Sequence, residues 1–208
     1  LGSIVSYENE DGEQEIIDGQ QRITSLFLLL RAIYTKLTSY ENKTIEQENF
    51  IRQIEPALWK QAKLTGEVDY TSVLITSRVI DNEGNKILQN ILESGIANPK
   101  ATDNYSKNYI LFQKLFNKLC ELSPTLMLEF IYYTLNRAVV FPIKTDSQDD
   151  ALSVFSTLND RGLPLSEADI FKAKMYNKIK KEYKKLFIKQ WKNLSERAIY
   201  AKDNVKQL

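Results

Sequence analysis

Five consecutive residues, Asp18 to Arg22, place a carboxylate, a glycine, two amides and a guanidinium directly after two isoleucines. Apolar residues at helical spacing follow at once, beginning with Ile23 and Leu26, so the group lies where a strand passes into a helix. The first N–H groups of a helix have no partner within it and lie at the positive end of its dipole. The position therefore predicts an anion site.

Each residue type in this first motif suits a bound phosphate. Gly19 permits an unusual φ or a close approach by a ligand. Arg22 opposes the helix dipole, which an anion held by its guanidinium fork would explain. Asp18 is a candidate to hold Mg²⁺ or orient a water, and Gln20 or Gln21 to position that water. The alternative is that Asp18 only caps the helix and the other polar residues form solvated surface.

A second polar group follows an apolar run near residue 155. It consists of Asn159, Asp160, Arg161 and Gly162. Gly162 suits the left-handed position that ends many helices, and Ser166 with Asp169 makes a capping pattern for another helix. A helix–turn–helix connection explains these three residues. It does not explain Asn159 with Arg161, which repeat the amide and guanidinium of the first motif.

Composition excludes several kinds of chemistry. The 208 residues include no histidine, which rules out a Ser-His-Asp triad, a His-ligated zinc site and a His-dependent nuclease centre. The single cysteine, Cys120, cannot form an intrachain disulfide and fits a reducing compartment. No apolar run reaches the roughly 18 residues of a membrane span. We expect a cytoplasmic protein of one large or two small domains, without a membrane partner.

Charge is distributed unevenly along the chain. Phe171 to Leu208 carries twelve Lys and Arg against three Asp and Glu, whereas the other 170 residues carry 16 basic and 24 acidic groups. A basic end suggests an anionic partner or a solvated face, and both readings stay open. DNA contact would fall on Lys178, Lys181 and Lys185. The aromatic residues among these lysines fall near helical spacing and are expected to face a core.

Local signals predict an α+β fold that is mostly helical. Residues 1–18 read as strand, turn and strand, the first so close to the start that upstream sequence is expected. Thr44 with Gln47 makes a capping box for a helix reaching Trp59, and Ser123 with Pro124 begins another over 124–136. Further helices are expected over 84–94, around 110–119 and after Ser147. Residues 68–80 are ambiguous, and 138–145 read as a buried strand.

The two motifs, "IIDGQQRITSLFLLL" and "VFSTLNDRGLPLSEADIFKAKMY", occur in an order that resembles the DGQQR-motif domain of GmrSD-type restriction endonucleases. These are modification-dependent phage-defence enzymes. The resemblance implies a ParB/sulfiredoxin-like α/β subdomain, here without the family's upstream aromatic and arginine segment. It divides the chain into 1–40 with 137–175 as this nucleotide-binding subdomain, 41–136 as a helical insertion and 176–208 as a basic helical segment.

The resemblance also implies an activity. Such a domain binds and hydrolyses a nucleoside triphosphate with Mg²⁺ and couples it to DNA cleavage by an HNH-type nuclease domain, in cis or in trans. DNA would be bound through the full-length protein. The implied catalytic residues are Asp18, Gln20, Gln21 and Arg22. The implied phosphate-binding residues are Gly19, Thr24, Ser25, Asn159, Asp160, Arg161 and Gly162, and Asp169 and Lys172 support the second motif.

Two other functions fit the same residues. The chain could be a non-catalytic DNA-binding module whose DGQQR pocket accepts a backbone phosphate or a modified base. It could equally be an interaction scaffold in which both motifs only cap helices and join subdomains. Loss of nucleotide affinity in Arg22→Ala would favour the nucleotide-binding and hydrolysing domain. Loss of stability alone would favour the scaffold.

Overall fold

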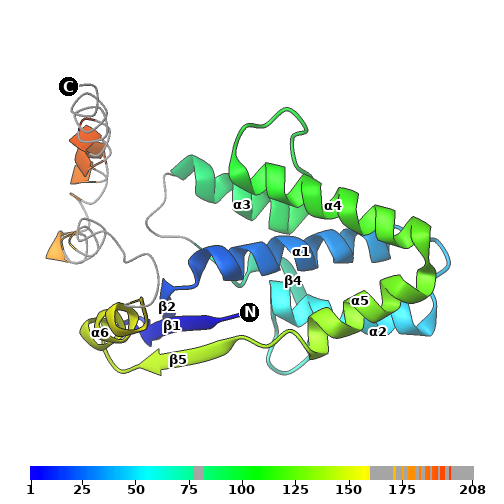
Figure 1. Cartoon of the computed structure of the whole chain (residues 1–208), viewed down its shortest axis with the longest axis horizontal. Helices are drawn as coiled ribbons and strands as arrows, with labels where there is room; N and C mark the ends of the chain where they lie inside the picture. Colours follow the sequence, from blue (N-terminus) through cyan, green and yellow to red (C-terminus); the bar gives the residue numbers. More distant parts are fainter. Residues whose placement is uncertain are drawn as a thin grey trace.

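The protein is an α+β fold in which helices predominate, as its sequence predicts (Figure 1). The computed structural model describes residues 1–76 and 82–159. Beyond these it describes residues 171, 175, 178–180, 183, 186, 187, 189–191, 193, 194 and 197. A small sheet with one covering helix lies beside a larger group of helices, and the helix that follows the first motif extends from one into the other (Figure 1).

The sheet has three strands in the order β2-β1-β5. Strand β1 (Ser3–Glu8) pairs antiparallel with β2 (Gln14–Asp18) through a tight turn and parallel with β5 (Phe141–Thr145). Helix α6 (Gln148–Asn159) covers the sheet, and its Ala151 packs with Val5 and Tyr7 of β1. The strand hairpin at residues 3–18 thus pairs with a strand that follows α5, much later in the sequence.

Helix α1 (Gln20–Thr38) lies at the centre of the helical part (Figure 1). Around it are α2 (Ile45–Leu58), α3 (Asn82–Ser94), α4 (Asn104–Leu122) and α5 (Pro124–Asn136). A two-stranded hairpin, β3 (Trp59–Gln61) with β4 (Val68–Val73), follows α2. Helix α1 contacts α2, α3 and α4, so it organises this part of the fold.

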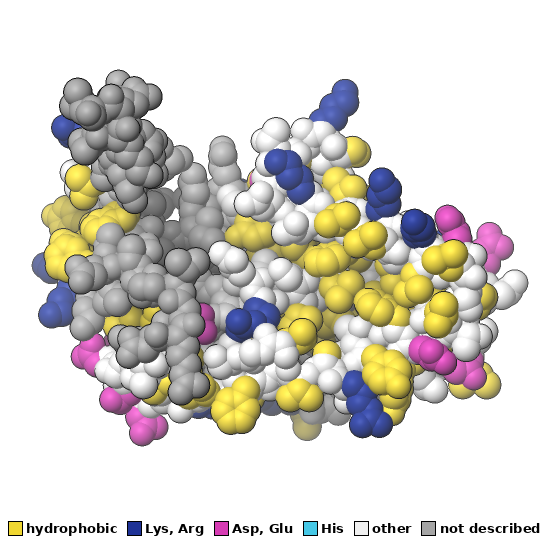
Figure 2. Space-filling view, viewed as in Figure 1, with side chains coloured by type: hydrophobic (Ala, Val, Ile, Leu, Met, Phe, Trp, Pro, Cys, Tyr) yellow, Lys and Arg dark blue, Asp and Glu magenta, His cyan; other side chains and the backbone are white. Residues whose placement is uncertain are grey.

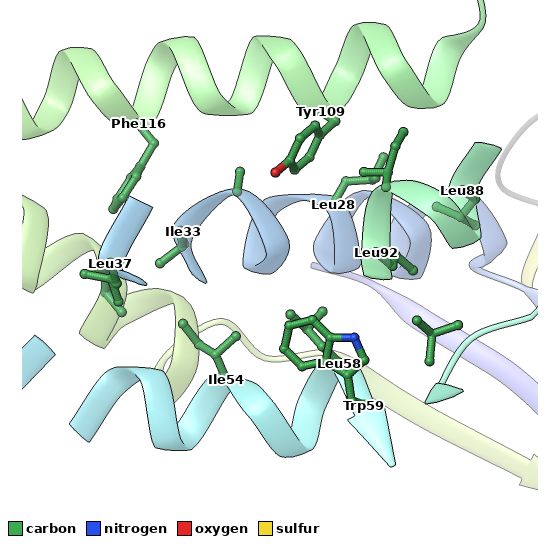
Figure 3. Packing of buried hydrophobic residues seen from close by; sticks show 14 of the residues in the cluster. Leu28, Ile33, Leu37, Ile54, Leu58, Trp59, Leu88, Leu92, Tyr109 and Phe116 are labelled. Carbon is green, nitrogen blue, oxygen red and sulfur yellow. The ribbon is translucent and has the colours of Figure 1, made fainter. Parts of the chain in front are cut away.

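One apolar core joins these helices. Leu28, Ile33 and Leu37 project from α1 into it (Figure 3). They lie between two sets of buried residues (Figure 3). One set comes from α3 and α4 and consists of Leu88, Leu92, Tyr109 and Phe116. The other comes from α2 and the start of β3 and consists of Ile54, Leu58 and Trp59. Fully burying one such side chain contributes about 1.5–3 kcal/mol. The leucine-rich run after the motif therefore forms the middle of the core.

Caps begin the helices where the sequence predicts them. Gln47 N donates to Thr44 Oγ1 over 3.3 Å and Thr44 N donates to Gln47 Oε1 over 3.1 Å, so the capping box is confirmed. Ser123 accepts from Leu126 N, with Pro124 as the first helical residue of α5. Ser147 likewise accepts from Asp150 N at the start of α6.

Two expectations are wrong. Strand β5 is not buried: it lies at the edge of the sheet, where Pro142 costs no ladder hydrogen bond, and Phe141 is 68% exposed. The helix after Thr44 does not include Trp59, because α2 ends at Leu58 and Trp59 begins β3. Within the ambiguous segment, β4 extends to Val73, and residues 77–81 lie outside the described residues.

A buried arginine, which the sequence analysis does not predict, links α1 to α3 by hydrogen bonds. Arg31 is only 6% exposed; its Nε donates to Leu92 O over 2.7 Å and its Nη2 to Glu93 O over 3.2 Å. These carbonyls belong to the last turn of α3, where helical partners are lacking. The guanidinium also lies over the rings of Tyr34 and Trp59. Burial lowers the pKa of Arg31 from its ordinary value.

Candidate functional site

The first motif occupies the junction between β2 and α1. Gly19 is the N-cap of α1 with φ 88° and ψ 9°, a left-handed conformation that favours glycine. No side chain of a described residue caps this helix end, and its first turn contains no acidic residue. The reading in which Asp18 serves as the cap is therefore wrong. The structure gives the N–H groups of Gln20, Gln21 and Arg22 no hydrogen bond to a described residue, and the anion site stays a prediction.

Asp18 is the last residue of β2 and lies opposite Val5 of β1. The register of the two strands shifts between Val5 and Ser6, and such a bulge re-aims the neighbouring side chains. Asp18 is half-buried, and the structure gives its carboxylate no hydrogen bond or ion pair within the described ranges 1–76 and 82–159. A carboxylate in this position has its lone pairs available for a cation or a water.

Arg22 folds back onto the beginning of β1. Its Nη1 donates to the backbone carbonyl of Ser3. A Cβ added at Gly2 would lie 3.1 Å from the Arg22 Cζ, and one at Gly19 would lie 3.1 Å from its Nη1. Glycines on both sides therefore give the guanidinium its room. Ser3 O is the only hydrogen-bond acceptor of the guanidinium among the described residues, and a guanidinium carries five N–H groups.

The two glutamines of the motif differ in their contacts. Gln20 Nε2 donates to Ile16 O over 2.7 Å and so fastens the first turn of α1 to β2. Gln21 is exposed, and none of the described residues hydrogen-bonds its side chain. Thr24 and Ser25 are half-buried in the second turn of α1. Gln21 is thus the freer of the two amides.

The second motif is described only at its beginning. Asn159 is the last residue of α6. That helix contacts β1 and β2, the strand that ends at Asp18, so both motifs start from one sheet unit. Asp160, Arg161, Gly162, Asp169 and Lys172 lie outside the described residues. Closure of the site by this motif stays a prediction.

The basic C-terminal segment is described at scattered positions. Lys178 is exposed, while Lys181 and Lys185 lie outside the described residues, so DNA contact there stays a prediction. The Trp191 ring lies 6.4 Å from that of Phe171 and 5.6 Å from that of Phe187. Tyr183 is more than half exposed, as is Phe171. The expectation that the aromatic residues here face a core is wrong for Tyr183.

Metal binding would rest on few protein ligands. In the described part of the chain, no three acidic, Cys or His residues are grouped so that they could hold a metal ion. Mg²⁺ at nucleotide sites commonly uses one or two carboxylates together with phosphate oxygens, so Asp18 alone fits that requirement. None of the described helices has the length and apolar character needed to cross a membrane.

Comparison with known proteins agrees with the motifs. The family model described as "GmrSD restriction endonuclease, N-terminal domain" matches residues 1–176, which include both motifs. A search of curated proteins gave no match. The match spans most of the 208 residues. The chain therefore belongs to the GmrSD restriction endonuclease N-terminal domain family.

Proposed function

We propose that this domain binds a nucleoside triphosphate with Mg²⁺ at the β2–α1 junction and hydrolyses it to regulate DNA cleavage by an HNH-type nuclease domain. One observation carries the proposal. The N-terminus of α1 begins at a left-handed Gly19 without a side-chain cap, between an Asp18 with no described partner and the Arg22 fork. Membership of the restriction endonuclease family supports the link to DNA cleavage.

Each group has a task in phosphoryl transfer. The N–H groups at the start of α1 would bind phosphate oxygens, and the free edge of the Arg22 guanidinium would neutralise charge on the transferred group. Asp18 would hold Mg²⁺ together with those oxygens, and the ion would add charge neutralisation. Gln21 would orient the attacking water, because the Gln20 amide is engaged with Ile16 O. Asn159 and the residues after it would close the site.

Calorimetric titration of the chain with ATP, GTP, CTP and UTP in Mg²⁺ tests the proposal. Loss of charge-assisted hydrogen bonds, at about 1.5–3 kcal/mol, predicts that Arg22→Ala binds roughly 10- to 100-fold more weakly. Arg22→Lys keeps the charge and a donor for Ser3 O. Its nucleotide affinity should therefore lie between those of the parent and of Arg22→Ala. Arg52→Ala is the matched control, since Arg52 is exposed and its side chain hydrogen-bonds only Asn49 among the described residues.

Stability must be measured on the same variants. Arg22→Ala also removes the bond to Ser3 O, so its urea midpoint will fall somewhat. Equal nucleotide affinity of folded Arg22→Ala and the parent would refute the phosphate site. Binding of duplex DNA that depends on Arg22, without any nucleotide binding, would instead favour the DNA-binding module. Loss of stability alone would favour the scaffold.

A further inference from the structure

Helices α4 and α5 expose a continuous apolar surface away from the sheet. Its members are Leu111, Leu115 and Leu122 of α4 and Leu126, Phe130 and Tyr133 of α5, here called the α4–α5 face. Leu115 is 54% exposed and Leu122 70%. Hydrophobic side chains cover the area over these two helices (Figure 2). Contiguous exposed apolar patches of this kind mark interaction sites on soluble proteins.

Most of this face is distinct from the core that the same helices build, although the Phe130 ring lies 6.0 Å from that of the buried Phe116. The buried side chains of α4 include Tyr109 and Phe116, and those of α5 are Met127 and Ile131. The exposed residues repeat at intervals of four and seven along α4 and of four and three along α5, so each helix carries a second apolar stripe. Adjacent stripes on two joined helices offer ridges and grooves into which a third helix can pack.

Charge along this face is mostly positive. Lys107, Lys114 and Lys118 are exposed on α4, and Lys114 and Lys118 each follow a leucine of the stripe by three residues. Arg137 is exposed just after α5, while the exposed acidic residues are Glu121 and Glu129. Within residues 1–76 and 82–159, the structure gives the three lysines no carboxylate partner. In Figure 2 basic side chains border the apolar area, and acidic side chains lie beside it at the right-hand end of the molecule.

We infer that the α4–α5 face docks an amphipathic helix of a partner protein, with a leucine-type stripe flanked by carboxylates. Apolar side chains of that helix would cover the exposed leucines, and its Glu or Asp residues would pair with Lys114 and Lys118. A second copy of this chain would bring the same positive surface. The basic end, Phe171 to Leu208, would also bring positive charge. Complementarity therefore selects an acidic helix, and this inference does not depend on the nucleotide site.

Two synthetic amphipathic helical peptides test the inference. They share one leucine stripe, and one carries Glu and the other Lys at the flanking positions; fluorescence anisotropy follows their binding to the full chain. We expect the acidic peptide to bind, and the double variant Leu111→Gln, Leu115→Gln to weaken binding at least tenfold. Lys114→Gln with Lys118→Gln should weaken it about fivefold and reduce its salt dependence. Leu64→Gln is the control, because Leu64 is fully exposed on the β3–β4 connection.

Circular dichroism would verify that each variant is folded, which is expected because all the altered side chains are exposed. Equal binding of the acidic and basic peptides, or no binding of the acidic one, would overturn the inference. So would self-association of the parent chain that is lost in the double leucine variant. Binding only to phosphatidylserine vesicles would assign the face to a membrane surface instead.

Discussion

Replacing Gly95 by alanine should test how tightly the buried Arg31 fixes the end of α3. Gly95 follows α3 with φ +71°, and its N–H donates to Ile91 O over 2.9 Å, the arrangement of a left-handed helix terminator. An added Cβ would lie 2.6 Å from Arg31 Nη2 and 2.8 Å from Thr35 Oγ1. The guanidinium cannot move aside freely, because α3 carbonyls and Thr35 bind it.

The expected decrease in the free energy of unfolding of Gly95→Ala has two parts. A left-handed alanine costs about 1–2 kcal/mol, and loss of the charge-assisted bonds of Arg31 adds about 1.5–3 kcal/mol, giving about 2.5–5 kcal/mol. Gly66→Ala is a matched control: its φ is +70°, but nothing lies within 4 Å of an added Cβ. Only the first part of the cost, about 1–2 kcal/mol, applies there.

Urea unfolding, followed by circular dichroism and by tryptophan fluorescence, measures both costs. Carrying Trp191→Phe in every variant leaves Trp59, which lies in the core beside Arg31, as the fluorescent reporter. An equal cost of Gly95→Ala and Gly66→Ala would refute the reasoning. In an Arg31→Ala background the excess cost of Gly95→Ala should disappear, and its persistence would show that the crowding lies elsewhere.

Three further outcomes follow from the contacts. Thr44→Ala should lower the free energy of unfolding by about 1 kcal/mol by removing the capping box of α2, as urea unfolding would show. Tyr109→Phe should cost about 1–2 kcal/mol in the same assay, because its hydroxyl donates to the buried Gly95 carbonyl over 2.9 Å. Burial, aided by Glu55, raises the pKa of Tyr34. The folded state therefore keeps the Tyr34 proton while the unfolded chain loses it above about pH 10, so thermal stability should fall as pH rises beyond that value. The fall should be smaller in Tyr34→Phe, and an identical fall would exclude this residue as a source.

Features that depend on neighbours in sequence could be predicted. The capping box at Thr44, the proline start of α5 and the unusual φ of Gly19 arise from residues within a few positions of one another. Apolar spacing likewise indicated most of the helices. It could not show that Leu111 and Leu115 face outward, because spacing reports a stripe and not what covers it.

Features made by distant segments could not be predicted. Strand β5 is an edge because the sheet has no further strand beside it within the described residues, and no local signal reports strand order. The Arg22 guanidinium meets the Ser3 carbonyl, and Arg31 meets α3 some sixty residues later. In the site, the sequence indicated an exposed helix start but not which donors are already engaged. The contrast between Gln20 and Gln21 required the structure.

The central position of α1 restricts how this chain can be divided. Residues 41–136 resemble an insertion in sequence, yet they build the core that covers Leu28, Ile33 and Leu37 of the helix beginning at Gln20. A shortened protein lacking that segment would keep the motif but expose the apolar side of its helix to water, which favours aggregation. The helical part is therefore the support on which the DGQQR helix folds, and the two must be expressed together.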